Sequence, residues 1–150
     1  MIKDPNSLLS AIEALALDNE PELKLAHMLN ALSAIKQEIP SSAWVGIYLK
    51  TDGKLILGPF QGTPACESIR FDKGVVGVCY SQGKTLVVPD VTKFPGYISC
   101  DPIAAQEVCV PMCVNGETVA VFDVDYPAGN PIADDAETLE KAAALLAKLL

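Results

Sequence analysis

One hairpin in the second half of the chain constrains the fold more than any other feature. Asn115-Gly116 separates two apolar runs, 107–114 and 117–125. Asn-Gly is the dipeptide that a type I′ turn favours, because both central residues of that turn need a positive φ. The chain therefore contains two long antiparallel strands, and its fold has to be built around a sheet.

Helical patterns flank this sheet on both sides. Apolar residues recur at helical spacing over 8–17, over 23–35 and, from the acids 134–135 onward, to 149. Shorter strands are expected at 44–49, 54–57, 66–71 and 85–88, with a short helix at 74–80. This order predicts an α+β fold: a mostly antiparallel sheet of about six strands, with the N- and C-terminal helices packed on one face.

Length and charge narrow the class of protein. The 150 residues, half of them hydrophobic, fit a single domain over 1–150, with helices in 1–40 and the sheet, its loops and the last helix in 43–150. A net charge of −8 argues against nucleic acid or an anionic membrane as the partner. No leader-like apolar segment and no membrane-spanning stretch stands out, so we expect a cytoplasmic protein.

The five cysteines fall into two groups. Cys109 and Cys113 alternate with apolar residues along a strand, and Cys79 lies in an apolar helical run, so these three are expected in the core. Cys66 and Cys100 lie in or beside irregular segments, and each is followed directly by an acid. In a reducing compartment, loop cysteines of this kind are candidates for reactive thiols.

Three acids are expected near the open end of the hairpin. Asp123 and Asp125 share one face of their strand, and Glu107 begins the partner strand. A plain hairpin would place Glu107 opposite Val124 and on the other face, unless a bulge intervenes. The acids could share a proton, hold a hard cation such as calcium, or form a solvated sheet end. A calcium site would lack a loop of spaced oxygen ligands.

Two aromatic residues share a strand face. Trp44 and Tyr48 flank Gly46 at period-2 spacing. They are either ordinary core residues or one wall of a ligand cage, with Gly46 leaving room for the ligand between them.

Five blocks of sequence, taken together and in order, resemble the free methionine-(R)-sulfoxide reductases, enzymes of the GAF fold. The blocks are Trp44 to Leu49, Leu57 to Cys66, Phe94 to Asp101, Glu107 to Pro111 and Phe122 to Asp125. The resemblance implies thiol-dependent reduction of free L-methionine-(R)-S-oxide to L-methionine without a cofactor or metal. It also implies a thioredoxin-like dithiol as the reductant and a homodimeric enzyme.

The resemblance also assigns roles. Cys100 corresponds to the catalytic cysteine, which would form a sulfenic acid, and Cys66 to the resolving cysteine that would close a disulfide with it. The implied substrate-binding residues are two aromatics at the methyl sulfoxide end and three acids, which also serve in catalysis: Trp44, Tyr48, Glu107, Asp123 and Asp125.

The sequence departs from the family at the third cysteine, which is often present in a Gly-Val-Cys-Gly motif. Val76 stands there, and Cys79, one helical turn later, is either an auxiliary thiol or core; Tyr97 stands where His is common. Two alternatives therefore stay open: a GAF small-molecule sensor, and a thiol redox sensor without turnover. Mutation of Trp44 separates the second from the enzyme, because a pure thiol sensor does not need an aromatic wall.

Overall fold

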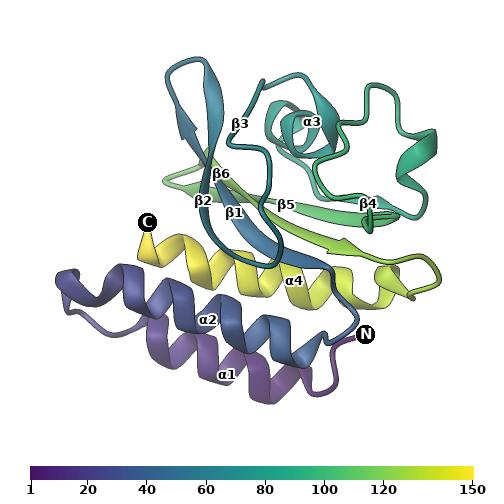
Figure 1. The fold of residues 1–150 in the computed structure, drawn as a ribbon. Helices are drawn as coiled ribbons and strands as arrows, with labels where there is room; N and C mark the ends of the chain where they lie inside the picture. The colour runs from purple at the N-terminus through teal and green to yellow at the C-terminus, as the bar shows by residue number, and fades with distance from the viewer.

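A single six-stranded sheet organises the computed structural model, which describes all of residues 1–150 (Figure 1). The strand order is β3-β2-β1-β6-β5-β4, and every neighbouring pair is antiparallel. The strands are β1 (Trp44–Thr51), β2 (Lys54–Gln61), β3 (Ser68–Ile69), β4 (Leu86–Val88), β5 (Gln106–Val114) and β6 (Glu117–Tyr126). The predicted α+β class with about six strands is confirmed.

Four α-helices cover the sheet unequally. The terminal helices α1 (Pro5–Ala16), α2 (Lys24–Glu38) and α4 (Ile132–Leu146) lie side by side on one face, as predicted (Figure 1). The short helix α3 (Gly74–Gln82) lies on the other face, beside the long segment between β4 and β5. None of these helices combines the length and apolar character that crossing a membrane requires.

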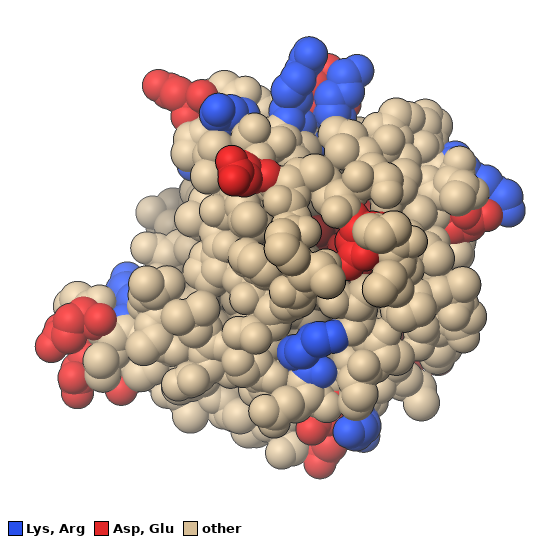
Figure 2. Space-filling view, in the orientation of Figure 1, with Lys and Arg blue, Asp and Glu red and all other residues tan.

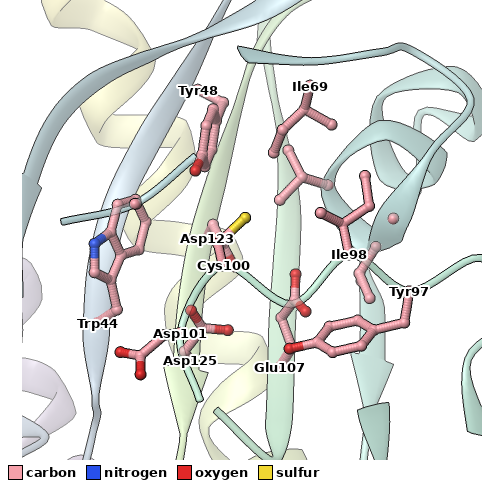
Figure 3. Close-up of a pocket in the computed structure, with 14 residues that line it drawn as sticks. Trp44, Tyr48, Ile69, Tyr97, Ile98, Cys100, Asp101, Glu107, Asp123 and Asp125 are labelled. Carbon is pink, nitrogen blue, oxygen red and sulfur yellow. The ribbon is translucent and has the colours of Figure 1, made fainter. Parts of the chain in front are cut away.

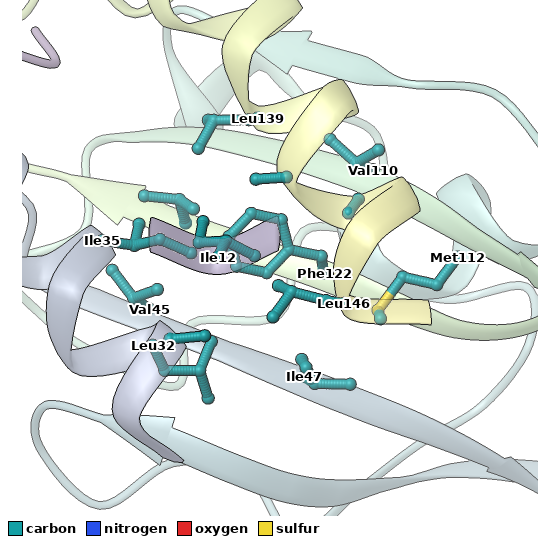
Figure 4. Close-up of a cluster of buried hydrophobic side chains, with 14 of the residues drawn as sticks. Ile12, Leu32, Ile35, Val45, Ile47, Val110, Met112, Phe122, Leu139 and Leu146 are labelled. Carbon is teal, nitrogen blue, oxygen red and sulfur yellow. The ribbon is translucent and has the colours of Figure 1, made fainter. Parts of the chain in front are cut away.

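The sheet separates two hydrophobic clusters. The larger holds 24 buried residues between the sheet and the terminal helices, with Phe122 of β6 among its largest side chains (Figure 4). The smaller holds 11 buried residues beneath α3. Alternation along β1 divides that strand between them: Val45 and Ile47 face the helices, while Trp44 and Tyr48 face the other side. Most of the apolar core thus lies on one face of the sheet, and the other face is available for a functional site.

A β-bulge interrupts the long hairpin. The strands pair next to the turn as Asn115-Gly116 predicts, but the register shifts between Met112 and Cys113 and leaves Val119 as the extra residue. Beyond the bulge Glu107 lies opposite Asp125. The placement expected for a plain hairpin, opposite Val124, is therefore wrong, and the bulge turns Glu107 onto the same face as the two aspartates.

Candidate active site

A pocket lies on the sheet face that α3 covers. Its floor comes from β1, β5 and β6, and its rim comes from the segment between β4 and β5 (Figure 3). The residues predicted from the sequence that line it are Trp44, Tyr48, Cys100, Glu107, Asp123 and Asp125. Chain segments more than fifty residues apart thus meet in one pocket, and these residues belong to the sequence blocks that carry the family resemblance.

Stacked aromatic rings form one wall. Trp44 stacks on Phe60 of β2, with ring centroids 5.4 Å apart, and on Tyr48, with centroids 5.8 Å apart. A Cβ at Gly46 would overlap the indole and lie 2.6 Å from Cβ of Phe60. The space over Gly46 is therefore filled by Trp44 itself, so of the two alternatives, the one in which Gly46 leaves room for a ligand between the rings is wrong. The rings belong to the core and still line the pocket.

The polar ends of these two rings hold the segment that follows β2. The indole Nε1–H of Trp44 donates a hydrogen bond to the carbonyl oxygen of Thr63, at 3.2 Å. The hydroxyl of Tyr48 donates to the carbonyl oxygen of Cys66, at 3.0 Å. The aromatic wall thereby fixes the backbone on both sides of Pro64.

Cys66 and Cys100 are joined by a disulfide, with their Cα atoms 5.5 Å apart. Beside it, the buried carboxylate of Asp101 accepts hydrogen bonds from Oγ1 of Thr63, at 2.7 Å, and from the backbone N–H of Ile103, at 2.8 Å. Asp101 therefore ties the segment that carries Cys100 to the segment that carries Cys66. It lines the pocket and was not predicted as a site residue.

The three predicted acids meet in the pocket without a neighbouring cation. Glu107 and Asp123 are 5% and 4% exposed, so the solvated-end interpretation does not hold for them. No ion pair in the structure includes Glu107, Asp123 or Asp125. Figure 2 shows acidic atoms set back in a hollow of a largely uncharged face, with most Lys and Arg side chains at its edges.

Burial is the main cause of unusual acidity in this cluster, and neighbouring charge adds to it. Burial, and then the charge of Asp125, raise the pKa of Glu107 to about 8. Burial followed by the charge of Glu107 raises the pKa of Asp123 well above its ordinary value, and burial followed by the charge of Asp123 does the same for Asp125. The pocket can therefore store a proton at neutral pH.

Cys109 is a member of this cluster that sequence reasoning placed only in the core. It is fully buried, as expected, but it faces the pocket acids: its thiol donates to Oε1 of Glu107, at 3.1 Å, and lies 3.5 Å from Oδ1 of Asp123. The signal was its spacing of two from Glu107, which puts both side chains on one strand face. Ligand atoms of these three residues lie within 4.8 Å of one another, a spacing that a metal ion could also bridge.

Of three further positions singled out in the sequence, two line the pocket and one does not. Val76 of α3 lines it, whereas Cys79 is fully buried in the smaller cluster and is not a lining residue. Burial raises the pKa of the Cys79 thiol. Tyr97 also lines the pocket, and its ring extends toward Glu107 (Figure 3). Burial and the charge of Glu107 raise the pKa of Tyr97 to about 12, so its hydroxyl stays protonated.

Comparison with known proteins agrees with this architecture. The GAF domain profile matches residues 26–150. The free methionine-R-sulfoxide reductase of Saccharomyces cerevisiae is 41% identical over 135 residues, which cover 83% of this chain and 74% of the yeast protein.

Two solved structures are similar over nearly the whole chain. One is the free methionine-R-sulfoxide reductase of Neisseria meningitidis in complex with its substrate, with a TM-score of 0.87, 32% identity and coverage of 97% of this chain and 87% of that one. The other is the reduced form of fRMsr of Staphylococcus aureus, with a TM-score of 0.90, 33% identity and coverage of 100% and 98%.

Proposed function

Because this chain belongs to the GAF domain family, among its free methionine-R-sulfoxide reductases, we propose that it reduces free L-methionine-(R)-S-oxide with Cys100 as the nucleophile and Cys66 as the resolving thiol. The observation that carries the proposal is the pairing of these two cysteines at the rim of a pocket that has an aromatic wall and a cation-free acid cluster.

The first step transfers oxygen from the substrate to sulfur of the enzyme. The Cys100 thiolate attacks the sulfoxide sulfur, and a carboxyl group of the cluster protonates the departing oxygen. Methionine leaves, and Cys100 becomes a sulfenic acid, which is the oxidised product of the step. The raised pKa of Glu107 supports this role, since a carboxyl group that titrates near 8 still carries a proton at neutral pH.

The acid cluster also gives a reason for choosing a free amino acid. The α-ammonium of the substrate, which a residue inside a peptide lacks, can pair with the half-buried Asp125; its positive charge opposes the raised pKa of that carboxyl group and favours the ionised form in the complex. The rings of Trp44 and Tyr48 offer an apolar surface to the S-methyl group. Charge and shape therefore both favour a small zwitterion over a protein substrate.

The second and third steps restore the enzyme. The Cys66 thiol attacks the sulfenic acid on Cys100, which forms the disulfide and releases water. An external dithiol then exchanges with the disulfide and is itself oxidised. The reductant is expected to be thioredoxin-like. The homodimer and the cytoplasmic location remain predictions, as does an auxiliary role for Cys79.

The deciding experiment mixes the reduced protein with one equivalent of free L-methionine-(R)-S-oxide and counts methionine formed and thiols lost. We expect one methionine and two thiols lost. Cys100→Ser should form none. Cys66→Ser should complete one turnover without forming the disulfide. Cys113→Ser should match the wild type, because Cys113 is exposed at the end of β5; its expected place in the core is wrong.

A protein that binds the sulfoxide but forms no methionine would contradict the proposal and indicate a GAF sensor. Thiol oxidation by peroxide alone, with no dependence on Trp44, would indicate a thiol redox sensor.

A further inference from the structure

We propose that Cys109 is a positioning residue of this reductase, whose buried thiol orients the Glu107 and Asp123 carboxyl groups and sets which of them holds the proton that they share. The inference rests on the proposed function for its catalytic consequence. Its physical content, a thiol that controls two carboxyl groups, can be measured without turnover.

The geometry places the thiol between the two acids. Cys109 follows Glu107 by two residues on β5 and lies directly opposite Asp123 of β6 in the strand register. Its Sγ is 3.1 Å from Oε1 of Glu107 and 3.5 Å from Oδ1 of Asp123. The bulge near Val119 sets this pairing, so one irregularity of the hairpin brings all three groups together.

A thiol has one proton and therefore serves one carboxyl group at a time. The shorter distance identifies Glu107 as the acceptor. A hydrogen bond between the two acids lowers the pKa of Glu107 and raises that of Asp123, so Glu107 is the first of the two to release its proton as the pH rises, and the proton that they then share stays on Asp123. Both bonds lower the pKa of Glu107, so the thiol reinforces Glu107 as the group that gives up its proton first and Asp123 as the group that keeps its own.

The environment explains why a thiol suits this place. Burial, followed by the charges of Asp123 and Glu107, raises the pKa of the Cys109 thiol, so it remains a donor. A Lys or Arg at this depth would hold both acids ionised and abolish the proton store. A weak, neutral donor orients the carboxyl groups and leaves one of them protonated. The other titratable groups around this cluster come from β1, α3, the segment before β5, and β6: Tyr48, Cys79, Tyr97, Asp101 and Asp125.

The test compares Cys109→Val, which removes the donor at similar volume, with Cys109→Ser, which keeps a donor. Cys113→Val, at the exposed end of β5, is the matched control. Two readouts are recorded on each protein: the pH dependence of kcat/KM with dithiothreitol as reductant, and the titration of the Glu107 and Asp123 carboxyl carbons by ¹³C NMR without substrate.

Loss of the donor should raise the Glu107 titration by about half a pH unit to one pH unit, since a hydrogen bond of this kind changes an equilibrium by about 3- to 10-fold. The alkaline limb of kcat/KM should move upward by the same amount, and kcat near neutral pH should fall by about 3- to 10-fold as the carboxyl groups lose their orientation. Cys109→Ser should keep the Glu107 titration at or below its wild-type position, and Cys113→Val should change neither readout.

If the Glu107 and Asp123 carboxyl groups titrate in Cys109→Val as they do in the wild type, the inference is overturned, and Cys109 is only a buried core residue. If that variant does not fold, a Glu107 titration raised in Cys109→Ser overturns it equally. A wild-type protein that fails to reduce the sulfoxide contradicts the proposed function alone, because the carboxyl titrations still decide the role of the thiol.

Discussion

At the scale of single residues, three carboxyl groups lie together without a cation, which makes their ionised forms unfavourable in the folded protein. Glu107, Asp123 and Asp125 all have pKa values above the ordinary range, with burial as the first cause. In the unfolded chain the same groups titrate near pH 4. Between the unfolded and the folded pKa values, the folded protein therefore holds more protons than the unfolded chain.

This difference fixes the sign of the pH dependence of stability. Because the native state binds the extra protons, the free energy of unfolding should be greatest at mildly acidic pH and decrease as pH rises toward and through about 8, where Glu107 loses its proton. Each group contributes a slope of up to about 1.4 kcal/mol per pH unit. Urea unfolding at several pH values between 5 and 9 measures it.

Glu107→Gln should flatten this slope, since an amide does not titrate, while Glu13→Gln on an exposed helix position should leave it unchanged. A free energy of unfolding that rises with pH over the same range would show that the acids are ionised in the folded protein.

Residue types alone predicted much of the site. The loop cysteines, the paired aspartates and the aromatic pair on one strand face all line or border the pocket. Cys109 was missed because a thiol between apolar residues in a buried strand has the same pattern whether it faces helices or acids. Its spacing of two from Glu107 places both side chains on one face, but only the register of the neighbouring strand shows that the aspartates share that face.

At the scale of elements, the β5–β6 hairpin contains two strand registers that differ by one residue. The Asn115-Gly116 turn sets one pairing, the site needs another, and the extra residue Val119 absorbs the difference. The sequence identifies the turn, and it shows that a plain hairpin would place Glu107 on the face opposite the two aspartates. It could not locate the bulge, because neither Met112 nor Val119 is a residue type that marks one.

Deleting Val119 should therefore be tolerated. A hairpin without the extra residue can still pair Glu107 with Asp125, because the register beyond the bulge already omits Val119. We expect a folded protein that keeps its sulfoxide reductase activity within about 10-fold of the wild type, the range of a small loss of positioning. Circular dichroism and the single-turnover assay measure the outcome.

The informative control inserts a second residue after Val119, which the existing bulge cannot absorb. A folded deletion variant that has lost all activity would show that the bulge itself, and not only the register, shapes the site.

At the scale of the whole molecule, stability and chemistry occupy opposite faces of one sheet. The helix-covered face holds the larger cluster, whereas the site lies in the smaller one. This division was predictable in part, because alternation along the strands and the terminal helical stripes indicate which face is covered. The path of the segment between β4 and β5 was not, since its contacts with the acids have no periodic signature.

Phe122→Ala tests the division from the covered face. Phe122 is fully buried against the terminal helices, so its truncation should lower the free energy of unfolding by about 3–5 kcal/mol. Denaturant unfolding of the reduced protein measures this. Val87→Ala, on the exposed edge strand β4, should change it by no more than about 0.5 kcal/mol. A loss below about 1 kcal/mol at Phe122 would show that this face is not what holds the fold together.

The cluster of three acids without a neighbouring cation also affects which reactive compounds can approach Cys100. Anionic electrophiles and disulfides, glutathione disulfide among them, are repelled by Glu107, Asp123 and Asp125 once these lose protons, whereas a zwitterion can turn its ammonium group toward them. The three acids that we propose to bind the substrate thus also keep anionic disulfides away from the proposed nucleophile. Selectivity of this kind needs no lid, and it would weaken in concentrated salt, because screening shortens the reach of the charges.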